Sequence, residues 1–425
     1  MAVFDAGRLP DWLAYLEGLH PKSIDMGLAR VSHVRDVMGL KPGFPVLTVA
    51  GTNGKGSVCA FLTSILTAAG YKVGTHTSPH LLRYNERVML DGQEAGDDLL
   101  VESFRAIETA RGDTSLTYFE FGVLSAMKVF IDASVDVAIL EVGLGGRLDA
   151  VNIFDADVAS IVSIDLDHQA YLGDNREDIG REKAGVFRQG RPAICGDTNP
   201  PQSVIDEAVR IGAPLALIGT EFGWQKEAEG QQWMFWHGDA RKHALPMPAL
   251  RGPYQLGNAA VALAMLQSIR AQLPVALADI KRGLLEVNWP ARCQVLPGRP
   301  QVVLDVAHNP HAARALKSAL DQMGYAESTH AVFGMMADKD IDEVIRILGE
   351  RIAHWHVAAP DLPRAEPADA LAARIRASQP RAQVDACESV AAAWQAATRT
   401  AGENDRILAF GSFYTVAEVM AARGQ

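Results

Sequence analysis

The residues best suited to chemistry form one short run, Gly51-Thr52-Asn53-Gly54-Lys55-Gly56-Ser57. Glycines let backbone N–H groups close around an anion, and a lysine at this point reaches the outer phosphates of a nucleotide. The Ser57 hydroxyl is placed to contact Mg²⁺. The strict pattern G-x-x-x-x-G-K-[ST] is not met, because Val49 replaces its first glycine and Gly56 separates Lys55 from Ser57. The run therefore predicts a nucleotide-phosphate loop of a variant type.

The flanking sequence supplies the two elements that such a loop needs. Residues 46–50 are mostly apolar and β-prone, which predicts a buried strand. Residues 58–69 repeat apolar side chains at the spacing of one helical face, and Gly70 ends that pattern. A chance glycine-rich turn with a surface lysine is the alternative. It leaves unexplained why a strand and a helix both occur at the required places.

Three further polar residues follow predicted strands on the same side as the loop, namely Ser78, Glu141 and His168. A hydroxyl, a carboxylate and an imidazole, together with phosphate oxygens, could hold Mg²⁺. Taken singly, a histidine is more often structural, and Glu141 could cap a neighbouring helix. Their shared position at the ends of strands makes them a candidate metal site.

Other polar residues are less informative by themselves. Lys183 lies in a predicted helix and is read as a solvated surface lysine. The run Asp305-Val306-Ala307-His308-Asn309-Pro310 ends a strand with polar and turn residues, which suggests a second site. Two arginines could serve it. Arg292 opens a predicted strand over residues 293–296, and Arg299 lies in the turn of a predicted hairpin.

The order of elements predicts an α/β fold with two domains. Strands alternate with helices through residue 195, and polar clusters follow the strands, which indicates a parallel sheet with its site along one edge. Residues 220–250 alternate aromatic and polar residues, as in a β-meander. A second α/β unit begins with the strand at residues 302–306. Prolines just before it mark a boundary, so the predicted domains are residues 1–296 and 297–425.

The composition restricts the class of protein. A net charge of −11 argues against a general nucleic-acid binder or a protein of anionic membranes. The four cysteines form no C-x-x-C pair and lie in or beside apolar sequence, which predicts buried thiols in a reducing compartment. There is no basic segment followed by an apolar core at the N-terminus and no apolar stretch of membrane length. We expect a cytoplasmic protein.

Four motifs together resemble the folylpolyglutamate synthase family, which belongs to the Mur-ligase-like ATP-dependent amide ligases. They occur in order across nearly the whole chain: Gly51 to Ser57, Thr77-Ser78-Pro79-His80-Leu81, Glu141 to Asp149, and Asp305 to Pro310. The chain is most similar to the bifunctional bacterial form, which carries dihydrofolate synthase and folylpolyglutamate synthase activities. The resemblance implies a P-loop-containing parallel-sheet N-terminal ATPase domain and a smaller Rossmann-like C-terminal domain that serves glutamate ligation.

The resemblance also implies roles for particular residues. The ATP-binding residues would be Gly54, Lys55, Gly56, Ser57, Asn258, Arg292 and Asp305. The magnesium ligands would be Ser78, Glu141, His168 and a carbamylated Lys183. The residues that hold dihydropteroate would be Asp25, Met26, Gly27, Leu28, Thr117, Tyr118, Phe119, Glu120, Leu148, Asp149 and Ala150. The family usually reads Pro-Gly-Arg at the hinge arginine, whereas this chain has Pro290-Ala291-Arg292 there and a literal Pro-Gly-Arg at Arg299. The spacing from Arg292 to Asp305 resembles that of the family, which favours Arg292.

The activity implied is ATP- and Mg²⁺-dependent addition of L-glutamate to dihydropteroate and to the glutamate tail of tetrahydrofolate, through an acyl phosphate. Lys55 would neutralise charge on the transferring phosphoryl group, Lys183 would act through the metal, and His308 is a candidate base for the glutamate amine. The expected partners are these small molecules, with no nucleic acid or membrane, and the chain is expected to be a monomer. Two alternatives are a cell-wall Mur ligase and an ATP-switched binding module without ligase activity.

Overall fold

The computed structural model describes residues 4–22, 24–227 and 231–424. The chain divides into two compact units, of which the first comprises residues 1–249 and 256–288 and the second residues 250–255 and 289–425. The sequence prediction put the boundary after residue 296. Residues 289–296 belong to the second unit, because their strand pairs with the first long strand of that unit's sheet.

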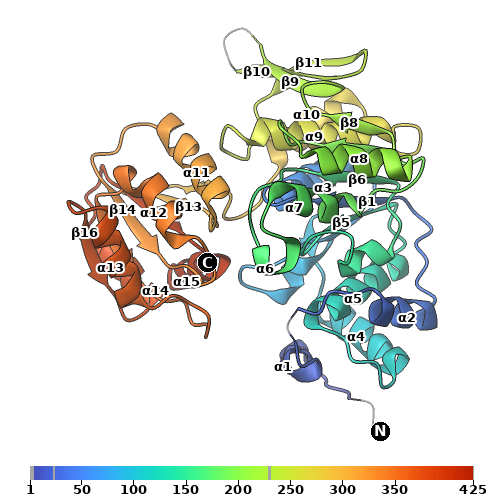
Figure 1. Cartoon of the computed structure of the whole chain (residues 1–425), viewed down its shortest axis with the longest axis horizontal. Coiled ribbons are helices and arrows are strands. Elements are labelled where there is room, and N and C mark those ends of the chain that lie inside the picture. The colour runs from blue at the N-terminus through green and yellow to red at the C-terminus, as the bar shows by residue number, and fades with distance from the viewer. Residues whose placement is uncertain (1–3, 23, 228–230, 425) are drawn as a thin grey trace. The chain divides into compact units, whose positions relative to one another are not determined.

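The first unit is built on an eight-stranded sheet with the order β4-β3-β2-β5-β1-β6-β7-β8 (Figure 1). The strands are β1 (Val46–Ala50), β2 (Val73–His76), β3 (Val88–Leu90), β4 (Gln93–Glu94), β5 (Val137–Glu141), β6 (Val158–Ile161), β7 (Ala193–Cys195) and β8 (Leu215–Leu217). The six strands from β2 to β8 in this order run parallel, and β3 and β4 pair antiparallel at one edge. The predicted parallel sheet is confirmed, with β1 in its interior.

Helices cover this sheet. They are α1 (Leu9–Leu19), α2 (Ala29–Met38), α3 (Lys55–Ala68), α4 (Asp97–Arg111), α5 (Tyr118–Asp132), α6 (Gln169–Leu172), α7 (Arg176–Ala184), α8 (Gln202–Ile211), α9 (Gln255–Ser268) and α10 (Leu277–Glu286), with 3-10 turns η1 (Tyr84–Arg87) and η2 (Ala150–Ile153). α3 packs on β1, β2 and β5, and α10 packs along α3. The crossing with α10 is close because a Cβ at Gly283 would lie 2.6 Å from the Ile65 Cα. This packing fixes the start of α3 at the end of β1.

Alternation along the central strands divides the interior of the first unit. Val46, Ala50, Ala138 and Leu140 are buried in one core with side chains of α1, α2, α4 and α5. Leu47, Val49 and Ile139 alternate with them on the same strands, are also buried, and point to the opposite face. Strands that are apolar on both faces are typical of a parallel sheet covered by helices on both sides.

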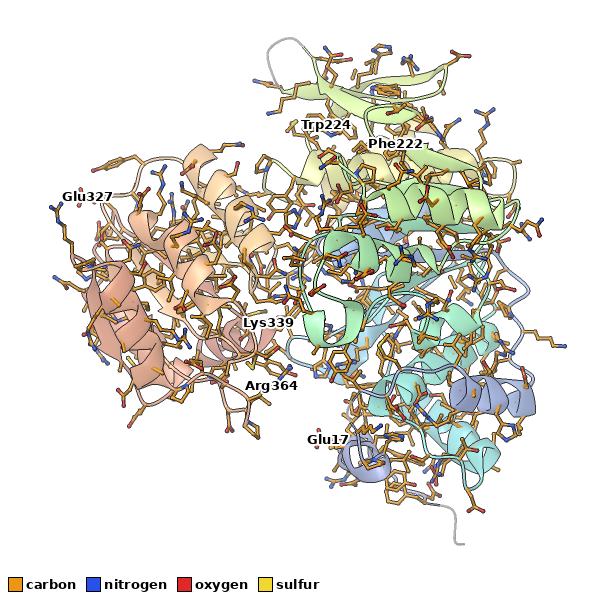
Figure 2. All side chains as sticks on the ribbon, in the orientation of Figure 1. Glu17, Phe222, Trp224, Glu327, Lys339 and Arg364 are labelled. Atoms are coloured by element: carbon orange, nitrogen blue, oxygen red, sulfur yellow. The ribbon has the colours of Figure 1, made fainter. Side chains whose placement is uncertain are left out.

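A three-stranded antiparallel sheet forms the remainder of the first unit. It consists of β9 (Phe222–Lys226), β10 (Gln232–His237) and β11 (Ala240–Pro246), which confirms the meander predicted over residues 220–250. Phe222 and Trp224 of β9 are labelled in Figure 2. Phe222, Trp233 and Phe235 are fully buried, so one face of this small sheet is covered.

The second unit has a six-stranded sheet with the order β12-β13-β17-β14-β15-β16 (Figure 1). Its strands are β12 (Gln294–Leu296), β13 (Gln301–Leu304), β14 (Thr329–Phe333), β15 (His354–Val357), β16 (Gln383–Ala386) and β17 (Arg406–Phe410). Its helices are α11 (Pro310–Gln322), α12 (Ile341–Leu348), α13 (Ala368–Ser378), α14 (Val390–Thr400) and α15 (Phe413–Ala422), with the 3-10 turn η3 (Gly349–Arg351). The strands from β13 to β16 in this order are parallel, and β12 and β13 form the predicted hairpin. Within the described residues, no helix has both the length and the apolar character needed to cross a membrane.

Candidate functional site

The glycine-rich loop joins β1 to α3, and two of its glycines are required by space and conformation. Gly54 has φ +85°, and a Cβ there would lie 2.8 Å from both Asn258 Oδ1 and Val162 Cγ1. Gly51 has φ +151°, and a Cβ there would lie 3.1 Å from the Val162 backbone nitrogen. A side chain at either position would be strained and crowded. The contact at Gly54 also places Asn258, a predicted ATP ligand, against the loop.

Backbone hydrogen bonds hold the loop to the segment that follows β6. The Thr52 N–H donates to the Ser163 carbonyl at 2.7 Å, and the Asn53 N–H donates to Ser163 Oγ at 3.1 Å. The Lys55 ammonium donates to the carbonyls of Gly51 at 3.1 Å and Thr52 at 3.2 Å, so its charge lies over the loop. Gly54 is the N-cap of α3, and as a glycine it has no side chain with which to cap this helix start. The first N–H groups of a helix have no acceptor within it and attract anions.

Ser78 and Glu141 meet at the ends of neighbouring parallel strands. The Ser78 N–H donates to Glu141 Oε2 at 3.1 Å, and Glu141 is 5% exposed. The charges of Glu141 and Lys55 both act on the Cys59 thiol in α3, whose pKa is raised well above its usual range mainly by burial. The predicted carboxylate ligand therefore lies close to the phosphate loop.

His168 is the remaining metal ligand that sequence pattern predicted. β6 ends at Ile161, and His168 follows it as the N-cap of α6, with φ +51°. Across residues 4–22, 24–227 and 231–424, no three His, Cys, Asp and Glu side chains are grouped to hold a metal ion. The predicted set contains only two such residues, since its other members are a hydroxyl and a lysine. A buried carboxylate beside a phosphate loop suits a divalent cation that keeps phosphate and water oxygens as ligands.

Lys183 in α7 is buried, so its reading as a solvated lysine is wrong. It is 3% exposed, and burial together with the charge of Lys55 lowers its pKa to about 7, against the opposing effect of Asp167 and Asp149. The close fit of α7 to the loop after β5 explains the burial. A Cβ at Gly146 would lie 2.8 Å from the carbonyl oxygens of both Glu182 and Lys183. The local sequence of a helix does not reveal that a distant loop covers it.

Asp149 organises the loop between Gly143 and Ala150. Its Oδ2 accepts from the Leu144 N–H at 2.8 Å, and its Oδ1 accepts from the Val151 N–H at 3.0 Å. Burial raises its pKa to about 6 although these hydrogen bonds oppose the shift. Both carboxylate oxygens are thus engaged by the protein backbone. Leu148 and Ala150 flank Asp149 in the same loop.

The other two segments predicted to hold dihydropteroate are joined by an arginine that sequence analysis did not single out. Arg30 Nη1 lies 2.7 Å from Asp25 Oδ2, and Arg30 Nη2 lies 3.0 Å from Glu120 Oε1. Glu120 also forms a capping box with Thr117 at the start of α5. The sequence pattern Thr-x-x-Glu signals this helix start. No local signal marks Arg30 as the link.

Side chains from these segments contact the loop after β5. Met26 Cε would lie 3.6 Å from a Cβ at Gly145, and a Cβ at Gly143 would lie 2.6 Å from the ring of Phe119. The neighbouring Tyr118 lies under Arg87, whose guanidinium carbon is 5.3 Å from the ring centroid. The three predicted substrate segments are therefore adjacent within the first unit.

In the second unit, Asp305 follows β13 and its carboxylate fixes the surrounding turn. It accepts from the N–H groups of Cys293 and Ala307, both at 2.8 Å. Burial raises the pKa of Asp305, and the nearby charge of Arg292 opposes that shift. The Arg292 guanidinium carbon lies 5.1 Å from the centroid of the Phe413 ring. The charge of Arg292 thus acts on Asp305 within the second unit.

The backbone explains the departure from Pro-Gly-Arg. Ala291 has φ +57°, in the left-handed region that favours glycine, and it immediately precedes Arg292. The family glycine thus corresponds to a left-handed residue here. Arg299 lies instead between β12 and β13 in the hairpin turn. This conformation supports Arg292 as the family arginine.

His308 lies on the same turn as Asp305. A hydrogen bond of 2.8 Å joins its Nδ1 to the Val306 carbonyl. A carbonyl accepts only, so Nδ1 carries the proton and the lone pair of the neutral ring is on Nε2. Asn309 then caps α11 by accepting from the Ala312 N–H at 2.9 Å. A histidine held in one tautomer is suited to accept a proton.

Two sequence models of protein families match the chain. The Mur ligase middle domain matches residues 49–266, which include the phosphate loop, and the Mur ligase glutamate ligase domain matches residues 291–413.

Individual proteins are similar over nearly the full length. The dihydrofolate synthase/folylpolyglutamate synthase of Escherichia coli (strain K12) is 46% identical over 416 residues, which are 98% of this chain and 95% of that protein. Among solved structures, E. coli FolC in complex with DHPP and ADP has a TM-score of 0.93 and 46% identity, covering 99% of this chain and 98% of that one. A bifunctional folylpolyglutamate synthase/dihydrofolate synthase with Mn, AMPPNP and L-glutamate bound has a TM-score of 0.91 and 45% identity, covering 100% of both chains.

Proposed function

The chain belongs to the Mur ligase family, and from this premise we propose that it is an ATP-dependent amide ligase that joins L-glutamate to folates. It adds L-glutamate to dihydropteroate, which forms dihydrofolate, and to the glutamate tail of tetrahydrofolates. This is the dual activity of dihydrofolate synthase and folylpolyglutamate synthase, the name of its relatives. The glycine-rich loop that leads into α3 with Gly54 as its N-cap, beside the buried Glu141, is the observation that carries the proposal.

Chemically, the substrate carboxylate attacks the γ-phosphate of ATP, which gives an acyl phosphate and ADP. Lys55 and the loop N–H groups oppose the negative charge on the transferring phosphoryl group. The neutral amine of L-glutamate then attacks the activated carbonyl, and phosphate leaves. His308 is assigned as the base that keeps this amine neutral, since its Nδ1 is fixed by the Val306 carbonyl.

Residues from both units are assigned as ATP ligands. In the first unit they are Gly54, Lys55, Gly56, Ser57 and Asn258. The short distance between Gly54 and the Asn258 side chain supports this set. In the second unit they are Arg292 and Asp305. The left-handed Ala291 favours Arg292 over Arg299.

The metal is assigned as Mg²⁺, with Ser78, Glu141, His168 and Lys183 as ligands. When bound, Mg²⁺ supplies charge neutralisation at the phosphate oxygens. The proximity of Ser78 to Glu141 supports the first two assignments. An unmodified Lys183 ammonium would repel the cation, so this residue requires a separate argument.

Lys183 is assigned as a carbamate. The ammonium first loses one proton, and the neutral amine then adds to carbon dioxide and releases a second, so that a cation becomes an anion with two oxygens. Burial at 3% exposure and the neighbouring Lys55 both disfavour the ammonium form. The modification removes that conflict and supplies the ligand type that Mg²⁺ prefers.

The carbamate has a direct test. Lys183→Ala should lose most of the activity, and acetate or formate should restore part of it by supplying carboxylate oxygens. Carbon-13 NMR of protein in labelled bicarbonate should show one carbamate signal that Lys183→Ala lacks. A spectrum without that signal in the presence of magnesium and nucleotide would contradict the assignment.

The dihydropteroate site is assigned to residues 25–28, 117–120 and 148–150, whose adjacency in the first unit supports the choice. Both carboxylate oxygens of Asp149 accept hydrogen bonds from backbone N–H groups of its own loop. We therefore assign this residue the role of holding the loop of the site in its conformation. We further propose that the chain acts as a monomer in the cytoplasm, where its free cysteines stay reduced. Light scattering during size-exclusion chromatography tests the monomer.

One assay tests the function. ADP release should require L-glutamate together with dihydropteroate or tetrahydrofolate, and it should be absent when either the folate or the glutamate is omitted. A cell-wall Mur ligase would instead respond to a UDP-linked muramyl substrate. An ATP-switched binding module would bind nucleotide without any glutamate-dependent ADP release. Either of those results would contradict the proposal.

A further inference from the structure

Arg30, in the first turn of α2, holds together two segments that are far apart in the sequence. Its Nη1 lies 2.7 Å from Asp25 Oδ2, and its Nη2 donates to Glu120 Oε1 and to the Asp25 carbonyl, both at 3.0 Å. One guanidinium therefore bonds to the backbone and side chain of the first segment and to the side chain of the second. A planar fork of donors makes such a link possible.

Both carboxylates have further contacts that fix them. Glu120 Oε2 accepts from the Thr117 N–H at 2.7 Å, and the Glu120 side chain is 4% exposed. Asp25 lies beside His20 at 3.4 Å and Lys22 at 3.7 Å. The two acids are thus held in place by contacts within the protein.

The pairing of Arg30 with Glu120 has an electrostatic reason. A buried carboxylate is costly unless it is paired and hydrogen-bonded. The capping box satisfies one oxygen of Glu120, and the Arg30 guanidinium satisfies the other. Without this arginine, Glu120 would lose its paired cation, and the two segments would lose the link that joins them.

Next to each acid in the sequence, the segments present an apolar or aromatic side chain. Met26 approaches Gly145, and Phe119 packs on Gly143, so both contact the loop after β5. A flat conjugated ligand such as a pteridine is bound by side chains of this kind. The spacing of Met26 and Phe119 depends on the link through Arg30.

We propose that Arg30 is a positioning residue of the dihydropteroate site, an inference that rests on the proposed function. It sets the separation of residues 25–28 from residues 117–120 and does not itself touch the reacting atoms. Its effect is on folate binding, and it leaves the phosphate loop and the ATP contacts unchanged.

Arg30→Lys is the variant that tests this role, because it keeps the charge and removes the fork. We expect the KM for dihydropteroate to rise about tenfold, while kcat and the KM for ATP stay within about twofold. Arg111→Lys is the matched control. Arg111 pairs with Glu108 at 2.6 Å in the same unit and contacts Tyr15, and neither partner is assigned to a site.

Hydrogen exchange gives a readout that is independent of activity. In Arg30→Lys, amide protection should fall within residues 24–28 and at the start of α5, and it should stay as in the wild type elsewhere. Arg111→Lys should change exchange near α1 and α4 and leave the KM for dihydropteroate unchanged. Glu120→Gln keeps a capping residue and removes the charge, so it should raise the same KM by a smaller factor.

Three results would overturn the role of Arg30. They are an unchanged KM for dihydropteroate in Arg30→Lys, an equal rise in the KM values for ATP and dihydropteroate, and an equal KM effect in Arg111→Lys. Failure of the proposed function is distinguished by the wild-type enzyme. If the wild-type protein shows no glutamate-dependent ADP release, both the proposed function and the role of Arg30 are overturned. If the wild type is active and Arg30→Lys is unaffected, only the positioning role of Arg30 is overturned.

Discussion

In both units a parallel strand leads into a helix at a predicted site, and the two helix starts differ in how their N–H groups are satisfied. β1 leads through a glycine-rich loop to α3, whose N-cap is Gly54 and has no side-chain cap. β13 leads through Asp305 to α11, whose N-cap Asn309 accepts from the Ala312 N–H at 2.9 Å. Asp305 also accepts from the Ala307 N–H at 2.8 Å.

The difference indicates what each helix start can bind. A side-chain cap occupies donors that would otherwise attract an anion, so α11 is a fixed support for His308 and is poorly suited to a phosphate. Glycines at the start of α3 contribute no such acceptor, and Lys55 adds a positive charge. We therefore expect the nucleotide phosphates at α3. Three substitutions test this contrast, and a fourth tests the left-handed residue before Arg292.

Lys55→Ala should have the largest effect. The lysine opposes the charge on the transferring phosphoryl group, and removal of such an interaction is worth about a hundredfold in kcat. Circular dichroism should show an intact fold, because the ammonium donates to carbonyls of its own loop. Near-normal turnover in this variant would remove the phosphate loop from the mechanism.

Gly54→Ala should raise the KM for ATP about tenfold, because a left-handed residue and two contacts of 2.8 Å would distort the loop. Gly70→Ala is the matched control, since Gly70 has φ +88° and its Cβ would meet nothing within 4 Å. Both variants should lose about 1 kcal/mol of stability from the left-handed alanine. Equal KM values for ATP in the two variants would show that the crowding at Gly54 is irrelevant to binding.

Asn309→Ala should reduce the free energy of unfolding by about 1 kcal/mol through loss of the α11 cap. The KM for ATP should stay within about twofold of wild type, because this helix start is not a phosphate site. Urea unfolding and steady-state kinetics measure the two quantities. A large rise in the KM for ATP with unchanged stability would reverse the proposed contrast.

Ala291→Gly should have the smallest effect and should stabilise the protein by about 0.5 kcal/mol. Ala291 has φ +57°, which glycine adopts without strain, although glycine also increases the entropy of the unfolded chain. Ala401→Gly is the control, because Ala401 has φ −71° and gains nothing from the change. Destabilisation by Ala291→Gly as large as that by Ala401→Gly would contradict the left-handed assignment.

Much of the fold followed from local pattern. The apolar run at residues 46–50, the glycines and the periodic residues after Lys55 specify a strand, a loop and a helix over adjacent positions. The alternation at 220–250 and the turn around Arg299 predicted antiparallel strands that the structure contains. Because parallel strands end at one edge, the sequence also anticipated that Ser78 and Glu141 would meet. These features depend on residues that are close together in the sequence, which is why the sequence alone predicts them.

Tertiary structure decided the environment of individual side chains. Lys183 is buried because the loop at Gly146 fits against α7, and Arg30 links Asp25 to Glu120 across a sequence separation that local pattern does not span. The carboxylate oxygens of Asp149 and Asp305 accept hydrogen bonds from backbone N–H groups, and the sequence alone does not reveal these partners. Periodicity and turn residues specify local elements, whereas burial and ion pairing depend on which distant segments pack together.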